Sequence, residues 1–375
     1  MTRVIGIPSE VKDSERRVGL QPDGAAELVH GGHEVLVQQG AGVGAGFSDS
    51  EYEKAGARLL STPEEVFAAA DLIVKVKEPV PSEYELFKEG QELFTYLHLA
   101  ADKELTQFLL ERKIASIAYE TVALDDGSLP LLTPMSEVAG RMATQAAAHS
   151  LENTSGGAGL LLGGVPGTPA ARVTIIGGGV SGTEAAKIAV GMRAVVRVMD
   201  INPKRLAYLS DIFEGRVDLV TPNRARTAAY VAESDVVIGA VLVAGAKAPK
   251  LVSREMVASM RPGSVVADIA IDQGGCIETS RPTTHSEPTY VEEGVVHYCV
   301  ANIPGAVART STLALTSATL PYLTRVAEDG VEGAAAADPV LAKGLSTLRG
   351  ELLSEPVAMA HGLEYSRYKA NEVSG

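Results

Sequence analysis

The sequence predicts an α/β protein with two doubly wound parallel-sheet domains. The chain has 375 residues, more than a single hydrophobic core usually supports. Short runs rich in β-branched residues alternate with helical stretches, which is the pattern of parallel strands and their crossover helices. This alternation occurs twice, and residues 70–74 (ADLIV) resemble residues 234–238 (SDVVI). Together, these observations indicate two similar sheets rather than one.

The strands are expected in two groups. In the first lobe they are residues 4–7, 33–37, 72–76 and 114–119, and in the second lobe residues 172–176, 195–200, 235–240 and 264–269. A connecting helix is expected over residues 136–145, with Ser136 as its N-cap. A long helix is expected over residues 312–326, and the tail from Ala327 is expected to return to the first lobe.

These elements predict one domain inserted into another. Residues 1–130 and 306–375 would form a substrate domain, and residues 131–305 would form a dinucleotide-binding domain. We expect a cleft at the junction, where ligands of two-domain proteins commonly bind.

The amino-acid composition limits the kinds of molecule that the protein is expected to bind. The chain is 46% hydrophobic and 21% charged, which excludes a disordered or fibrous protein. Its net charge of −14 opposes binding to nucleic acid or to an anionic membrane, and favours small-molecule ligands. No apolar run approaches the roughly 20 residues that span a bilayer, and charged residues from Glu10 on come before any signal-peptide apolar stretch could develop, so neither feature is expected.

The cysteine content points to a reducing compartment. Cys276 and Cys299 are the only two cysteines, too few for a disulfide framework and unlike any zinc spacing. We expect both to be buried thiols in a cytoplasmic protein. Glu120 and the scattered acids form no convincing ligand set, so no metal site is predicted.

A glycine motif marks the second lobe. The apolar residues 172–176 lead into Gly177, Gly179 and Gly182, which form G-x-G-x-x-G, and a helical stretch follows from Val180. In this context the first glycine allows a tight turn, the second lets a pyrophosphate approach and the third lets helix and strand pack closely. A purely structural glycine turn is the alternative interpretation. The motif predicts a Rossmann-like dinucleotide site.

An acid after the second strand of this lobe indicates the choice of cofactor. Asp200 stands close to the roughly 20-residue spacing expected of a ribose-binding carboxylate, which accepts hydrogen bonds from the 2′-hydroxyl and repels a 2′-phosphate. NAD is therefore expected rather than NADP. Lys204 and Arg205 qualify this, because either would neutralise a 2′-phosphate, unless they are simply exposed cations at a helix start. In the first lobe the opening strand runs into Pro8, which has no amide to offer phosphate.

The first lobe supplies cations and a histidine at strand ends. Lys75 and Lys77 alternate after an apolar strand, His98 follows the apolar run 93–97, and Arg17 lies near the first strand. Lysine and arginine bind carboxylates, and histidine titrates near neutral pH. The alternative to a binding or catalytic role is that the two lysines are solvated, that His98 is a structural imidazole and that Arg17 is a surface cation. In the second lobe Asp268 and Asp272 follow a strand, and Asp272 is the better candidate because it lies nearer the glycine turn.

These residues together resemble the alanine dehydrogenase family. The matching segments span nearly the whole chain: residues 6–10 (GIPSE), 75–79 (KVKEP), 96–100 (YLHLA), 134–140 (PMSEVAG), 271–275 (IDQGG) and 281–284 (RPTT). The resemblance implies reversible oxidation of L-alanine by NAD and water to pyruvate and ammonium. It also implies a homohexamer.

By this resemblance, Arg17 and Lys77 would bind the substrate carboxylate, while His98 and Asp272 would transfer protons. The cofactor site would be lined by residues of the second lobe: Ser136, Gly177, Gly179, Val180, Gly182, Asp200, Arg205, Val241, Leu242, Ile269, Asp272, Arg281 and Asn302.

Two other functions compete with this one. One is the nucleotide-binding part of a proton-translocating transhydrogenase, which Lys77 and His98 argue against. The other is a dinucleotide sensor without chemistry, which would produce no NADH from alanine. Neighbouring amino-acid or lysine-pathway dehydrogenases share the fold, which is weak evidence for function.

Overall fold

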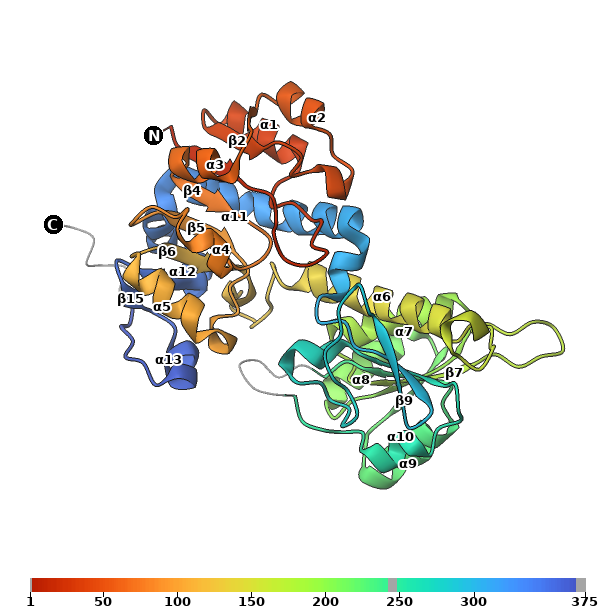
Figure 1. The fold of residues 1–375 in the computed structure, drawn as a ribbon. Coiled ribbons are helices and arrows are strands. Elements are labelled where there is room, and N and C mark those ends of the chain that lie inside the picture. Colours follow the sequence, from red (N-terminus) through yellow and green to blue (C-terminus); the bar gives the residue numbers. More distant parts are fainter. Residues whose placement is uncertain (1, 242–247, 369–375) are drawn as a thin grey trace. The chain divides into compact units, whose positions relative to one another are not determined.

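The computed structural model describes residues 2–241 and 248–368, and the chain divides into two compact units (Figure 1). Unit 1 contains Met1–Met135 and Val307–Gly375, and unit 2 contains Ser136–Ala306. The C-terminal segment therefore belongs to the same unit as the N-terminal strands, and unit 2 is inserted between them in the sequence.

Unit 1 is built on an eight-stranded sheet in the order β15-β14-β6-β5-β4-β1-β2-β3. The first six strands of the chain are parallel, while β14 is antiparallel to β6 and β15 is antiparallel to β14. The strands are β1 (Val4–Ile7), β2 (Glu34–Gln38), β3 (Arg58–Leu60), β4 (Leu72–Val74), β5 (Glu92–Thr95), β6 (Ala115–Ala118), β14 (Leu345–Leu348) and β15 (Glu351–Leu352).

The helices of unit 1 begin where the sequence supplies caps and prolines. Thr62 accepts the amide of Glu65 at 3.3 Å, and Pro63 opens the helix that follows, as a capping box and an N1 proline predict. The helices are α1 (Pro22–His30), α2 (Asp49–Lys54), α3 (Pro63–Ala69), α4 (Pro81–Tyr84), α5 (Lys103–Glu111), α11 (Ala308–Ala337), α12 (Pro339–Gly344) and α13 (Glu355–His361), with short 3-10 turns at η1 (Val43–Ala45), η2 (Leu99–Ala101) and η3 (Tyr119–Thr121).

Unit 2 has a seven-stranded sheet in the order β12-β13-β11-β10-β7-β8-β9. All its neighbours are parallel except β12, which is antiparallel to β13. Its strands are β7 (Arg172–Ile176), β8 (Val195–Met199), β9 (Val217–Val220), β10 (Val236–Gly239), β11 (Val265–Asp268), β12 (Thr289–Glu292) and β13 (Val295–Tyr298).

Buried apolar side chains pack on both sides of this sheet. One cluster joins Ala185 and Ala189 of α7 to strand residues such as Ile175, and a second lies around Val237. Strands buried on both faces are typical of parallel sheets. The helical elements are α6 (Thr133–Ser150), η4 (Asn153–Ser155), α7 (Val180–Gly191), α8 (Pro203–Phe213), α9 (Arg224–Glu233), α10 (Arg254–Ala258), η5 (Ile269–Gln273) and η6 (Ile303–Val307).

The two sheets share one topology. In each, the six parallel strands lie in the spatial order third, second, first, fourth, fifth, sixth, counted along the chain. This is the doubly wound order, whose ligands bind beyond the carboxyl ends of the strands where the order reverses. That point lies between β1 and β4 in unit 1, and between β7 and β10 in unit 2. The predicted α/β class with two doubly wound sheets is confirmed.

Several boundaries differ from the prediction. Helix α6 begins at Thr133, so Ser136 lies inside its first turn and does not cap it; Pro134 is tolerated there because first-turn amides need no helical partner. Strand β4 ends at Val74 rather than at residue 76. Helix α11 continues to Ala337 through Pro321, with a non-helical backbone at Gly330.

Two further expectations concern the cysteines and membrane-spanning helices. Cys276 and Cys299 are buried free thiols, as predicted. No described helix is both long and apolar enough to cross a membrane.

Candidate active site

The glycine loop of unit 2 has the geometry that its sequence predicts. Gly177 has φ +101°, and a Cβ there would lie 2.7 Å from the carbonyl oxygen of Ala240, which follows β10. A Cβ on Gly182 would lie only 1.9 Å from the carbonyl oxygen of Gly177. By contrast, a Cβ on Gly179 would meet no protein atom within 4 Å. The fold therefore needs glycine at 177 and 182, and at 179 it leaves open space at the start of α7.

Asp200 lies beside this loop, directly after β8. Its Oδ2 accepts the amide of Gly178 at 2.7 Å and its Oδ1 accepts the amide of Asn202 at 2.7 Å. Arg205 also holds the loop, because its guanidinium donates to the carbonyl of Gly178 and, at 2.7 Å, to the hydroxyl of Thr183. Lys204 is exposed. Asp200 and Arg205, which both follow β8, are thus hydrogen-bonded to the glycine loop and the start of α7.

A buried acid organises the segment that carries Asp272. Asp268 is fully buried at the end of β11, and it accepts the amides of Ala270, Cys276 and Ile277 at 3.2, 3.3 and 3.1 Å. Burial raises the pKa of its carboxyl. Asp272 is exposed within η5. The two acids after this strand therefore differ: Asp268 is used to hold the loop, and Asp272 faces solvent from it.

The remaining predicted cofactor residues are spread over unit 2. Val180 is the first residue of α7, Val241 and Ile269 follow the ends of β10 and β11, and the guanidinium of Arg281 lies 3.9 Å from the ring centroid of Tyr290. Asn302 is half-buried, and its carbonyl contacts His285 Nε2 at 2.8 Å. Ser136 is half-buried in α6. Leu242 lies outside the described residues.

In unit 1 the predicted substrate residues follow consecutive strands of the sheet. Arg17 lies after β1, Lys77 after β4 and His98 after β5, and these three strands are neighbours. Because carboxyl ends of parallel strands meet at one edge, all three belong to the edge where doubly wound sheets bind ligands.

Arg17 is engaged by a neighbouring acid. Its Nε and Nη2 contact the two carboxylate oxygens of Glu15 at 2.7 and 2.5 Å, and its Nη1 lies 3.2 Å from the sulfur of Met135. The side chains of the ion pair are 2% and 0% exposed. The guanidinium fork of Arg17 is therefore buried and already binds one carboxylate, that of Glu15.

The two lysines have different surroundings. Lys75 is fully buried and forms salt bridges to Glu83 and Glu10, at 2.7 and 3.4 Å. Among the described residues, no carboxylate lies within salt-bridge distance of the Lys77 ammonium. Burial, together with Arg17 and Lys12, lowers the pKa of Lys77 even though Glu78 opposes the shift. Of the two lysines, Lys77 is thus the one whose ammonium has no carboxylate partner among the described residues.

His98 is exposed and has an unusual backbone. Its φ is +50° and its ψ is +35°, the left-handed region, which non-glycine residues adopt at a cost. Its amide donates to Glu120 Oε1 at 2.6 Å, and the Leu97 amide donates to the same carboxylate at 3.2 Å. The ring of Tyr96 lies parallel to the imidazole, 5.9 Å away between centroids. The Glu120 carboxylate thus holds the backbone at residue 98, from which the exposed imidazole projects.

Sequence reasoning did not assign roles to the acids at this edge. Glu15 holds Arg17, Glu120 holds the His98 backbone, and Glu10 accepts the amides of Val76 and Lys77. Glu78 lies near enough to the cations that Lys77, Lys12 and His98 lower the pKa of its carboxyl against the effect of burial. A signal was available: acids placed directly after apolar strands rarely stay buried without a partner.

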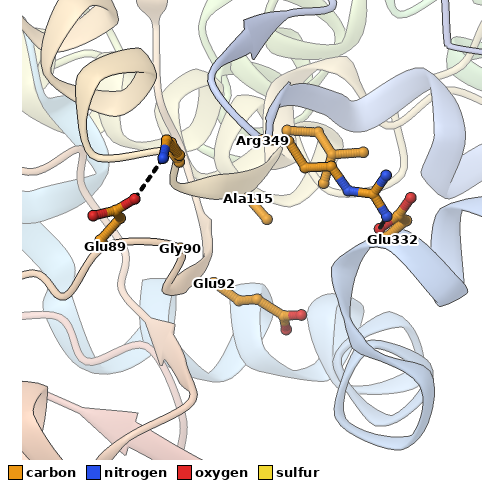
Figure 2. A pocket seen from close by; sticks show the side chains of 8 residues that line it. Glu89, Gly90, Glu92, Ala115, Glu332 and Arg349 are labelled. Atoms are coloured by element: carbon orange, nitrogen blue, oxygen red, sulfur yellow. Dashed lines mark hydrogen bonds and ion pairs between the residues drawn. The ribbon is translucent and has the colours of Figure 1, made fainter.

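A cavity of about 460 Å³ in unit 1 lies elsewhere (Figure 2). Glu92 and Ala115, which line it, are the first residues of β5 and β6, so it lies at the amino ends of these strands. Four of its charged side chains form two ion pairs, Lys113 with Glu89 at 2.6 Å and Arg349 with Glu332 at 2.7 Å, and Glu92 pairs with Arg3. The cavity therefore lies at the opposite edge from His98.

Within the described part of the chain, no group of three or more histidine, cysteine or acidic side chains is arranged to hold a metal ion.

Family models match the chain in two parts. The model described as "Alanine dehydrogenase/PNT, N-terminal domain" matches residues 6–139, and "Alanine dehydrogenase/PNT, C-terminal domain" matches residues 143–355. The chain belongs to the alanine dehydrogenase/PNT family. The predicted resemblance is thereby confirmed.

Individual members of the alanine dehydrogenase/PNT family agree with this assignment. An alanine dehydrogenase of Methanococcus maripaludis is 57% identical over 97% of this chain and 98% of its own length. A solved L-alanine dehydrogenase has a TM-score of 0.93 and 50% identity, covering 96% of this chain and 99% of that one. A transhydrogenase from Sinorhizobium meliloti also matches, with a TM-score of 0.80 at 26% identity over 94% of this chain and 99% of that one.

Proposed function

We propose that this chain is an NAD-dependent L-alanine dehydrogenase, which converts L-alanine, NAD⁺ and water reversibly to pyruvate, ammonium, NADH and a proton. The main support is the 57% identity to an alanine dehydrogenase over nearly the full length. The site residues are consistent with it, because carboxylate-binding cations and a histidine gather at the ligand edge of unit 1, and a dinucleotide loop occupies the ligand edge of unit 2.

The residues of unit 2 suit the dinucleotide. The open space at Gly179 and the start of α7 fit a pyrophosphate, which helix N-termini bind through their first amides and the helix dipole. Asp200 has a carboxylate beside the loop for the ribose hydroxyls. When bound, NAD supplies a hydride acceptor for the substrate Cα. We assign the cofactor contacts to the residues predicted from the sequence, including Ile269, Arg281 and Asn302.

The residues of unit 1 suit an α-amino or α-keto acid. Arg17 and Lys77 bind the substrate carboxylate. Loss of hydride from Cα leaves an iminium, water adds to this carbon, and the carbinolamine expels ammonia to give pyruvate. His98 and Asp272 accept and return the protons of the amine and the water, a role typically worth about 10²- to 10⁴-fold in rate.

A direct assay tests this function. Purified protein is mixed with NAD and a panel of small amino acids, and the absorbance of reduced nicotinamide is followed. We expect NADH to form with L-alanine, and pyruvate with ammonium to consume it. Activity only with NADP, or with another amino acid and not with alanine, would contradict the proposal.

Two further properties follow from the resemblance to this family. We infer that the protein is a homohexamer and that it acts in the cytoplasm in alanine catabolism. Light scattering on the purified protein measures the mass of the assembly, and a monomer at working concentrations would contradict the first inference.

The lowered pKa of Lys77 predicts how substrate binding depends on pH. Only the ammonium form binds a carboxylate, so the KM for pyruvate is expected to rise before pH reaches the ordinary lysine value of about 10.4. The groups that act on this ammonium are Glu78, Glu15, Arg17 and Lys12. The measurement is the KM for pyruvate against pH at saturating ammonia and NADH.

The control for this prediction is Lys77→Arg. The guanidinium keeps its proton throughout this range, with a pKa above about 12, so the variant should lose the alkaline rise in KM even if its KM is higher at neutral pH. The same rise in both proteins would show that another group titrates.

A further inference from the structure

A buried group of three charged side chains lies at the switch point of unit 1. Lys75 follows β4, and its ammonium contacts Glu83 Oε1 at 2.7 Å and Glu10 Oε2 at 3.4 Å. The side chains are 0%, 4% and 2% exposed. Burying one cation with two carboxylates is costly unless every charge has partners, so this group calls for an explanation beyond packing.

Each carboxylate also binds backbone amides of the segment that contains Lys77. Glu10 accepts the amide of Val76 at 2.6 Å and that of Lys77 at 3.3 Å. Glu83 accepts the amide of Val80 at 3.1 Å through the oxygen that does not face Lys75. The segment 76–80 is therefore attached at both of its ends to one buried lysine, through one carboxylate at each end.

The Lys77 backbone is held from its other side as well. Its carbonyl accepts the hydroxyl of Thr95, on β5, at 3.2 Å. The amide and carbonyl of this residue are thus both occupied, while no described carboxylate lies within salt-bridge distance of its ammonium. The arrangement fixes the backbone and leaves the ammonium available.

The contacts of Lys75 favour its charged form. Burial alone would lower the pKa of Lys75, but the carboxylates of Glu10 and Glu83 outweigh it and raise that pKa. Lys75 therefore stays protonated wherever Lys77 is, and it keeps both carboxylates in place.

We propose that Glu10, Lys75 and Glu83 are positioning residues that fix the backbone of Lys77 so that its ammonium meets the substrate carboxylate. This inference rests on the proposed function, in which Lys77 binds that carboxylate. It assigns Lys75 a role different from that of Lys77, although the two lysines stand two residues apart. A small displacement of a binding group is enough to affect catalysis strongly.

The test is Glu10→Gln, which keeps the shape of the side chain and removes its charge. The amide group can offer only one oxygen, so the Val76 and Lys77 amides cannot both keep a carboxylate acceptor. We expect the KM for pyruvate to rise about tenfold while kcat changes less than about threefold and the KM for NADH is unchanged. Glu83→Gln, which acts on the farther amide of Val80, should give a smaller rise.

Glu92→Gln is the matched control. Glu92 lies in the same sheet, at the amino end of β5, where it pairs with Arg3 at 2.6 Å. Like Glu10→Gln, the Glu92→Gln variant neutralises a mostly buried carboxylate, so both variants are expected to lose stability. In Glu92→Gln, however, the KM for pyruvate and the KM for NADH should stay at the wild-type level. An equal rise in the KM for pyruvate in the Glu10 and Glu92 variants would overturn the positioning role.

Amide hydrogen exchange supplies a readout that needs no activity. Peptides covering residues 76–80 should exchange faster in Glu10→Gln than in the wild type or in Glu92→Gln. Unchanged exchange in this segment would overturn the inference. If Glu10→Gln does not fold, Glu83→Gln carries the same two measurements. A wild-type protein without alanine activity would instead contradict the proposed function, and the exchange experiment would still test whether these residues hold the segment.

Discussion

Replacing His98 with asparagine is expected to lower kcat for alanine oxidation by about 10²- to 10⁴-fold, the usual contribution of a general acid or base. Asparagine is chosen because it tolerates the left-handed backbone that His98 adopts, with φ +50°, better than other residues do. The amide of residue 98 keeps its bond to Glu120, and an exposed position contributes little to stability. The loss should therefore come from the missing imidazole. The measurements are kcat and its pH profile.

Two controls separate the imidazole from the backbone. His98→Ala lacks the short polar side chain that lets asparagine adopt this left-handed backbone through local hydrogen bonds, so it should unfold more easily than His98→Asn while losing the same activity. His149→Asn changes an exposed histidine of α6 and should leave kcat unaltered. Near-wild-type turnover of His98→Asn, with the pH profile retained, would refute the acid–base role.

Gly182→Ala is expected to damage both the cofactor site and the fold. The new methyl group would lie 1.9 Å from the carbonyl oxygen of Gly177 and 3.3 Å from Ile175 Cγ2. Backbone must move to relieve the first contact, and overpacking of this kind typically costs about 1–3 kcal/mol. Because the displaced atoms belong to the dinucleotide loop, NADH affinity should fall at least about tenfold, which corresponds to roughly 1.4 kcal/mol. Fluorescence titration and denaturant unfolding measure the two effects.

Two other glycines make this prediction specific. Gly179→Ala places its methyl group in open space, so it should weaken NADH binding without reducing stability. Gly191→Ala lies at the other end of α7, where nothing is within 4 Å; it should bind NADH normally and be stabilised slightly by helix propensity. If Gly182→Ala bound NADH like the wild type, the loop would not hold the cofactor.

The parts of the fold that the sequence predicts well are those with local signals. The strand at residues 172–176, the glycine loop and Asp200 follow from patterns within thirty residues of one another, and β7 has the expected bounds. Strand β14 was missed because its partner, β6, is remote: Thr347 pairs with Ser116. No local pattern near Leu345 indicates a strand, because this strand forms only by pairing with β6, which is far away in the sequence.

The candidate site shows the same limit. Lys77, His98 and Arg17 were identified because cations and a histidine after apolar strands are conspicuous. Their supporting acids were not, because a glutamate in a sequence gives no indication of which amides it will accept. Glu10 reaches Val76 across 66 positions of the chain. The support that Glu10 gives the Lys77 backbone, and Glu120 the His98 backbone, therefore appears only once the strands are neighbours in the sheet.

The shared topology of the two sheets has a consequence for binding stoichiometry. At the reversal of strand order, one sheet offers a glycine loop and the start of helix α7, and the other offers Pro8 and the carboxylate of Glu10, which already accepts the amides of Val76 and Lys77. The first arrangement suits a phosphate group, whereas in the second the backbone amides that could bind a phosphate already have a carboxylate acceptor. We therefore expect two copies of one architecture to bind a single nucleotide per polypeptide, with the carboxyl edge of the other sheet left for a small organic acid.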